Sequence, residues 1–210
     1  MQLVLDIGSG RSLPDADTAI KLIDEVAKRD TKKHEVILKT QLFESAPPNV
    51  PLDHSVFSDA FWYAKEKGYQ LTSSVFDLYS LRYLLLFDDE KHRLPFIKIA
   101  CRPELYWLIG EIPRRIPVYV STNDYTQYLD SKGDNVTWMM CVPEYPATLT
   151  QYSVYSRYPP EVVSDHTVGW GLLTEFEPEI IEKHVCLEHT PDNPDAGAFA
   201  VLPEELEEIL

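Results

Sequence analysis

The sequence predicts an α/β protein built as a compact (β/α)8 barrel, also called a TIM barrel, on three observations. Short apolar runs alternate with segments of helical spacing along all 210 residues. Eight such runs occur, and eight parallel strands joined by helices close into this barrel. Polar residues collect where the runs end, which is where such barrels carry their chemistry. An open doubly wound sheet is the alternative, but Gly8-Ser9-Gly10 is too short for a dinucleotide-binding loop.

The elements follow one another in a regular order. The predicted strands cover residues 3–7, 34–39, 70–76, 96–100, 117–121, 136–142, 162–166 and 180–187. Residues 15–28 are the first helix, because apolar residues recur at helical spacing from Ala19 to Val26. The second helix ends at Gly68, and the last begins with Pro203 at its N-terminus. The helices cover residues 15–28, 53–67, 78–87, 104–112, 124–129, 172–176 and 203–210, and residues 149–158 stay unassigned.

Composition limits the classes of partner. No internal repeat or linker is visible, so residues 1–210 are expected to form a single domain. The net charge of −15 argues against nucleic acid or an anionic membrane as the main partner. No apolar run approaches the roughly 18 residues of a membrane span. No signal peptide is visible at the N-terminus, so a cytoplasmic protein is expected.

The three cysteines, Cys101, Cys141 and Cys186, are an odd number with no close pair. This usage favours buried free thiols in a reducing cytoplasm over a disulfide framework. Cys186 lies two residues after His184 and on the same side of the predicted strand. A thiolate ligand beside that histidine is therefore an alternative role for Cys186.

Two histidines end neighbouring predicted strands. His166 follows the apolar pair at 162–163, and His184 follows the pair at 180–181. Imidazoles at matching positions of adjacent strands can hold one divalent metal ion. The alternative for His166 is a structural role beside Asp165. The matching placement favours the metal interpretation.

Further polar residues occur at the strand ends: Asp6, Lys39, Ser73, Ser74, Lys98, Ser121, Thr122 and Ser164. Lys39 and Lys98 would aim two compact cations at one barrel mouth, a typical way to hold a phosphate or carboxylate. A structural ion pair with Glu182 or Asp6 is the alternative for either lysine. A strand-end serine can instead cap the following helix.

The strand ends and the last helix carry a series of short motifs. They are Leu5-Asp6-Ile7-Gly8-Ser9, Lys39-Thr40-Gln41, Ser73-Ser74-Val75-Phe76-Asp77, Phe96-Ile97-Lys98-Ile99-Ala100, Pro117-Val118-Tyr119-Val120-Ser121-Thr122, Ser164-Asp165-His166-Thr167-Val168-Gly169, Glu182-Lys183-His184 and Pro203-Glu204-Glu205-Leu206. In this order they resemble the barrel domain of the N-acetylneuraminate (sialic acid) synthase family and related nonulosonate synthases. The resemblance covers nearly the whole chain, and the last two strand motifs are the most specific.

The resemblance implies a carbon–carbon bond-forming transferase of carbohydrate biosynthesis. Such an enzyme condenses phosphoenolpyruvate with an N-acetylhexosamine-type (amino-sugar) aldehyde and releases phosphate. The implied cofactor is a divalent metal, Mn²⁺ first, with Mg²⁺ or Co²⁺ as alternatives. The implied site residues are the metal ligands His166 and His184, the phosphoenolpyruvate-binding Lys39, Ser74, Lys98, Ser121 and Ser164, and the catalytic carboxylates Asp6 and Asp195.

The chain departs from the family pattern at several points. Asp6 stands where the family has glutamate, Cys101 replaces a serine, and Pro143 replaces an asparagine. The last two replacements remove groups that would bind the anion, and Arg11 or Arg102 would compensate for them. The family's C-terminal antifreeze-like domain, which reaches across a dimer, is expected to be absent. The expected protein partners are a second copy, in a homodimer, or a separate sugar-binding subunit that would supply sugar recognition. The alternative function is a degenerate barrel that serves as a binding or regulatory module without turnover.

Overall fold

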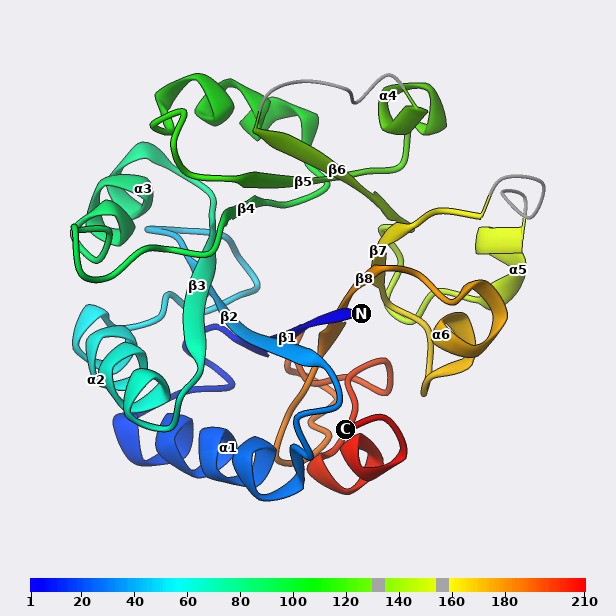
Figure 1. Ribbon diagram of the computed structural model, residues 1–210, viewed down its shortest axis with the longest axis horizontal. Coiled ribbons are helices and arrows are strands. Elements are labelled where there is room, and N and C mark those ends of the chain that lie inside the picture. The colour runs from blue at the N-terminus through cyan, green and yellow to red at the C-terminus, as the bar shows by residue number, and fades with distance from the viewer. Residues whose placement is uncertain (130–134, 154–158) are drawn as a thin grey trace.

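Eight parallel strands form a closed barrel in sequential order, which confirms the predicted (β/α)8 TIM barrel. The computed structural model describes residues 1–129, 135–153 and 159–210. Figure 1 shows the strands as an inner ring with the helices outside it. The strands are β1 (Gln2–Gly8), β2 (Glu35–Leu42), β3 (Gln70–Val75), β4 (Ile97–Ile99), β5 (Val118–Thr122), β6 (Val136–Cys141), β7 (Val162–Asp165) and β8 (Ile180–His184).

Helical segments connect the strands. Asp15 caps the first of them, since its Oδ1 accepts a hydrogen bond of 2.8 Å from the backbone N–H of Thr18. Two segments that the sequence predicted as ordinary helices are 3₁₀ helices, and residues 154–158 of the unassigned stretch lie outside the described residues. The segments are α1 (Ala16–Arg29), α2 (His54–Glu66), α3 (Leu78–Leu85), η1 (Pro103–Glu111), α4 (Tyr125–Leu129), α5 (Leu149–Ser153), α6 (Gly171–Phe176) and η2 (Pro203–Glu208).

The largest apolar core lies between the strands and the surrounding helices. The predicted apolar face of α1, from Ala19 to Val26, is buried in it. Phe57 of α2 and Leu84 of α3 have no exposed surface and belong to the same core. Burial of apolar area of this kind is the main term that holds helices on a barrel. In the part of the chain that the structure describes, no helix is both long and apolar enough to cross a membrane.

Along seven of the eight strands, the inward-facing side chains change from an apolar residue to one that lines the pocket two positions later. A second apolar cluster fills the end of the barrel where the strands begin. Residues i and i+2 of a strand point to the same side, so the residue two positions later also faces the interior. The interior pairs are Val4 and Asp6, Ile37 and Lys39, Phe96 and Lys98, Tyr119 and Ser121, Met139 and Cys141, Val162 and Ser164, and Ile180 and Glu182.

A glycine ends β1 at the mouth of the barrel. The φ angle of Gly8 is +92°, and a Cβ atom there would lie 2.7 Å from the Cβ atom of Ser12 and 3.2 Å from that of Asp195. Gly68 also has a positive φ angle, +85°, but a Cβ atom added there would have no neighbour within 4 Å. Gly8 therefore meets both a backbone and a packing requirement, and Gly68 meets only the first.

This difference gives a matched pair of variants. Gly68→Ala should lower the free energy of unfolding by about 1–2 kcal/mol, the expected penalty for an alanine with positive φ. Gly8→Ala should lower it by roughly 1–3 kcal/mol more, because the added methyl also overpacks the turn. Urea denaturation of both variants measures the difference. Equal losses would contradict the packing requirement at Gly8.

Candidate functional site

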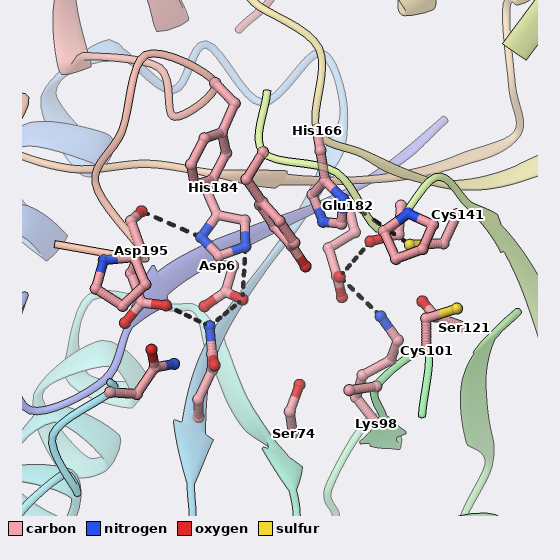
Figure 2. Close-up of a pocket in the computed structure, with 18 of the residues that line it drawn as sticks. Asp6, Ser74, Lys98, Cys101, Ser121, Cys141, His166, Glu182, His184 and Asp195 are labelled. Atoms are coloured by element: carbon pink, nitrogen blue, oxygen red, sulfur yellow. Dashed lines mark hydrogen bonds and ion pairs between the residues drawn. The ribbon is translucent and has the colours of Figure 1, made fainter. Parts of the chain in front are cut away.

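A pocket of about 430 Å³ opens at the carboxyl ends of the strands. Figure 2 shows its residues converging from all sides of the barrel. All nine site residues predicted from the sequence line this pocket: Asp6, Lys39, Ser74, Lys98, Ser121, Ser164, His166, His184 and Asp195. The barrel therefore brings together side chains that are far apart in the sequence, at the edge where parallel barrels carry their chemistry.

Two lysines and two carboxylates form a buried network in the pocket. The Nζ atom of Lys39 lies 2.5 Å from Oδ2 of Asp6 and 2.8 Å from Oγ of Ser74. The Nζ atom of Lys98 lies 2.7 Å from Oε1 of Glu182. Glu182 also approaches Lys39, with 3.8 Å between Oε2 and Nζ. The ion pairs that the sequence left open for the two lysines are therefore both present.

Mutual attraction keeps this network ionised despite its burial. Burial opposes ionisation of Asp6, but Lys39 and His184 outweigh it and hold the pKa of Asp6 below its ordinary value. Burial likewise opposes the charge on Lys39, and Asp6 with Glu182 raises the pKa of Lys39 above its ordinary value. The pKa of Glu182 is lowered because Lys39 and Lys98 outweigh its burial. The pocket thus presents ammonium and carboxylate groups.

Formal charges in the pocket balance. Of the two arginines considered for the anion site, Arg102 lines the pocket, whereas Arg11 lies outside it and donates to the carbonyl of Asp192. The described lining residues include three carboxylates, Asp6, Glu182 and Asp195, and three lysine or arginine side chains, Lys39, Lys98 and Arg102. Arg102 is itself paired with Glu104, with 2.8 Å between Nε and Oε1. A bound divalent cation would make this surface net positive.

The two histidines face each other across the pocket, with ring centroids 5.8 Å apart. Nδ1 of His166 lies 2.8 Å from the carbonyl oxygen of Val142, and Nδ1 of His184 lies 3.2 Å from that of Asp195. A carbonyl oxygen only accepts, so each Nδ1 carries the hydrogen and donates. Burial, with His184 next in importance, lowers the pKa of His166 to about 3. His166 is therefore a neutral imidazole whose Nε2 lone pair is available.

This arrangement fits a metal site. A ligating histidine usually donates its other ring N–H to a carbonyl or carboxylate, as both do here. Nε2 of His184 lies 3.5 Å from Oδ2 of Asp6, so a cation held by His184 would also lie close to the Asp6 carboxylate. The described residues contain no group of three His, Cys, Asp or Glu side chains arranged for a metal ion. The remaining ligands of an ion held by His166 and His184 would be water or substrate.

The loop after β8 is attached to β1 and β2 through Asp195. Oδ2 of Asp195 accepts from the backbone N–H of Ser9 at 2.9 Å and from its hydroxyl at 2.5 Å. Nε2 of Gln41 donates to Oδ1 of Asp195 at 2.9 Å and to Oδ2 of Asp6 at 3.1 Å. Asp195 also orients His184 through its carbonyl. Asp195 thus connects Ser9 and Gln41, at the ends of the first two strands, to His184.

The hydroxyls in the pocket differ in their partners. Oγ of Ser164 donates to Oε1 of Glu182 at 2.8 Å, and Ser74 accepts from Lys39. The Oγ atom of Ser121 is buried and has no hydrogen-bond partner among the described residues. A buried hydroxyl without a partner is unfavourable unless a ligand or water supplies one.

Some pocket residues were not chosen from the sequence. Glu182, Gln41 and Tyr145 line the pocket, and the ring of Tyr145 lies 4.1 Å from that of His166, centroid to centroid. Glu182 was considered only as an ion-pair partner, although it precedes His184 by two residues and so shares its face. Cys186 is not among the lining residues, which removes the support for its alternative role as a thiolate ligand.

The fold has clear relatives among solved structures. No protein-family model and no curated protein matches the chain. The sialic acid synthetase of Leptospira borgpetersenii serovar Hardjo-bovis, solved with citrate, superposes with a TM-score of 0.72 at 21% identity, over 98% of this chain and 80% of that chain. A protein described as spore coat polysaccharide biosynthesis protein E from Chromobacterium violaceum gives 0.72 at 18% identity, over 99% and 72%.

A third relative is a phospho-2-dehydro-3-deoxyheptonate aldolase (DAHP synthase) from Thermotoga maritima. Its TM-score is 0.69 at 11% identity, over 99% of this chain and 66% of that chain. Identities this low establish a common fold. The barrel of this chain is similar to that of sialic acid synthetase, in agreement with the resemblance of the motifs. A shared fold does not by itself fix the chemistry of the pocket.

Proposed function

We propose that the protein is a metal-assisted synthase that condenses phosphoenolpyruvate with an N-acetylhexosamine-type aldehyde and releases phosphate. One observation carries the proposal: two buried lysines, a serine hydroxyl without a partner among the described residues, and two histidines whose Nδ1 atoms contact backbone carbonyls converge in one pocket. The barrel shared with sialic acid synthetase and DAHP synthase supports this class of reaction. The family resemblance of the strand-end motifs supports the choice of substrates.

Lys39 and Lys98 would bind the two anionic ends of phosphoenolpyruvate. Both lysines are almost fully buried, so their charges are weakly screened by water. Ser121 lies in the same pocket with its hydroxyl free to donate, and Ser74 and Ser164 add hydroxyls at the neighbouring strand ends. Binding would exchange part of the lysine–carboxylate pairing for pairing with the ligand.

The reaction would join C3 of phosphoenolpyruvate to the aldehyde carbon, after which water adds at C2 and phosphate leaves. A divalent ion held by His166 and His184 would supply Lewis acidity at the aldehyde oxygen. Asp6 and Asp195 are the proposed carboxylates for the proton of the attacking water. The two carboxylates have different environments. Asp6 is paired with the Lys39 ammonium, whereas Asp195 accepts hydrogen bonds from the neutral donors Ser9 and Gln41.

Phosphate release tests the proposal directly. The protein is incubated with phosphoenolpyruvate, Mn²⁺ and each of several N-acetylhexosamines, and free phosphate is measured over time. Release that requires both the sugar and the metal is the expected result. If the protein binds phosphoenolpyruvate but releases no phosphate with any of the amino sugars, the proposed reaction is wrong and the non-catalytic alternative is favoured.

Ser121→Ala separates ligand binding from stability. The variant should bind phosphoenolpyruvate about 10-fold more weakly, because it loses a hydrogen bond to a charged ligand. Its free energy of unfolding should not fall, since the Ser121 hydroxyl has no partner among the described residues. Calorimetric titration and thermal unfolding measure the two quantities.

Thr167→Val is the matched control for that variant. The Thr167 hydroxyl is also buried and has no partner in the described part of the chain, but Thr167 does not line the pocket. Its removal should leave phosphoenolpyruvate affinity unchanged. A loss of stability in Ser121→Ala with unchanged affinity would assign Ser121 a structural role.

A binding or regulatory module is the second candidate function, and the charge balance of the pocket favours it. Each lysine already faces a carboxylate, so an anion must compete with Asp6 and Glu182. Asp6, one of the two proposed catalytic carboxylates, already accepts hydrogen bonds from Lys39 and Gln41, so it would have to exchange them to act on a water molecule. Such a module would bind the ligand without phosphate release.

A further inference from the structure

Two cysteines line the same pocket although they lie far apart in the sequence. Cys141 ends β6, and Cys101 follows β4, so the strand β5 separates them in the sheet. Side chains from alternate strands share one layer inside a barrel of this type, which brings residues of β4 and β6 together. Both cysteines line the pocket, and Figure 2 shows both on the wall that carries Ser121 and Lys98.

The two thiols are unequal. Cys101 is half-buried and reachable from the pocket, whereas Cys141 is 2% exposed. A hydrogen bond with the Cys141 thiol is the main cause that lowers the pKa of Cys101 to about 7, and the Lys98 ammonium adds to it. Cys141 is buried deeper in the pocket, where its Sγ atom lies 3.9 Å from Nδ1 of His166. Thiolate character and access therefore coincide at Cys101, as they do in reactive cysteines.

We propose that Cys101 and Cys141 form a redox-active thiol pair, a modification site for peroxides within the pocket. The Cys101 thiolate attacks one oxygen of hydrogen peroxide, which gives a sulfenic acid and hydroxide. The Cys141 thiol then attacks the sulfenic sulfur, the S–O bond breaks, and water leaves. In total, two thiols lose two electrons and two protons, and one peroxide becomes two waters. A dithiol reductant reverses the change by exchange.

Two further observations support this assignment. Cys101 lies in the loop between β4 and η1, outside any strand, so its backbone can move toward Cys141 without breaking the barrel ladder. Cys186 offers no competing partner, because it is buried in a separate cluster with Ala196 and Phe199. Burial raises the pKa of Cys186 to about 12. A reversible disulfide of this kind is typical of redox-sensing thiols in reducing compartments.

Peptide mapping of the oxidised protein tests the pair. The reduced full chain is treated with a small excess of hydrogen peroxide, digested, and analysed by mass spectrometry. The expected product links the Cys101 and Cys141 peptides, with the loss of two hydrogens, and dithiothreitol reverses it. In reduced protein at pH 7, iodoacetamide should modify Cys101 about 10-fold faster than either other cysteine. Neither readout requires phosphoenolpyruvate or turnover, so failure here differs from failure of the proposed function.

Three variants sharpen the outcome. Cys186→Ser should form the same linkage as the natural chain. Cys101→Ser should form none, and Cys141→Ser should leave a Cys101 sulfenic acid that dimedone traps. If Cys141→Ser fails to fold, the other two variants still decide. Linkage through Cys186, disulfides between chains, or direct oxidation of Cys101 to sulfinic acid without any linkage would each overturn the proposal.

Discussion

Asp165→Ala should lower the free energy of unfolding by about 3–5 kcal/mol, the usual loss when one partner of a buried ion pair is removed. Asp165 of β7 and Lys183 of β8 are opposite each other in the sheet, and neither side chain has exposed surface. The Lys183 Nζ atom lies 2.9 Å from Oδ2 of Asp165 and also donates to the carbonyl of Thr167. Without Asp165, an ammonium group would remain buried with a single acceptor.

A double variant shows whether this loss comes from the unpaired charge. In Asp165→Leu/Lys183→Met, both charges are replaced by apolar side chains of similar length, so the buried desolvation penalty disappears with the pair. The double variant should therefore be more stable than Asp165→Ala. Urea denaturation of the natural chain and the variants measures this order. A double variant less stable than Asp165→Ala would contradict the account.

His166→Ala and His184→Ala should each weaken Mn²⁺ binding by at least about 100-fold, because removal of a direct ligand exceeds the effect of its outer partners. Each imidazole directs Nε2 into the pocket because its Nδ1 donates to a backbone carbonyl. Electron paramagnetic resonance of free Mn²⁺ during a protein titration measures the affinity.

His189→Ala is the matched control for these two variants. The Nε2 atom of His189 lies 2.8 Å from the carbonyl oxygen of Ala200, and His189 is not among the residues lining the pocket. Its replacement should leave Mn²⁺ affinity unchanged. Unchanged affinity in both pocket-histidine variants would remove the metal assignment.

The position of the site follows from the sequence by a simple rule. A strand in a barrel alternates inward and outward, so an inward apolar residue is followed two positions later by another inward residue. That rule connects Val4 with Asp6 and Ile37 with Lys39, and both polar residues were predicted. The same rule places Glu182 in the pocket, two positions after the inward Ile180. From the sequence, Glu182 was considered only as an ion-pair partner. The two-residue spacing between Ile180 and Glu182 was therefore enough to predict Glu182 as a pocket residue.

Contacts between loops could not be predicted in the same way. Asp195 was chosen through the family resemblance, and its bonds to Ser9 depend on how the β8 loop crosses the end of β1. The approach of Cys101 to Cys141 depends on the loop after β4 and on barrel closure. Such contacts join residues far apart in the chain without periodic spacing, so only the folded structure gives them.

The charge balance of the pocket makes one measurement decisive for the account. Phosphoenolpyruvate is titrated calorimetrically into metal-free protein and into protein loaded with Mn²⁺. Because the pocket lining holds as many carboxylates as lysine and arginine side chains, the divalent ion should raise the affinity by at least about 10-fold. No binding under either condition, or equal affinity with and without Mn²⁺, would contradict a metal-assisted phosphoenolpyruvate site.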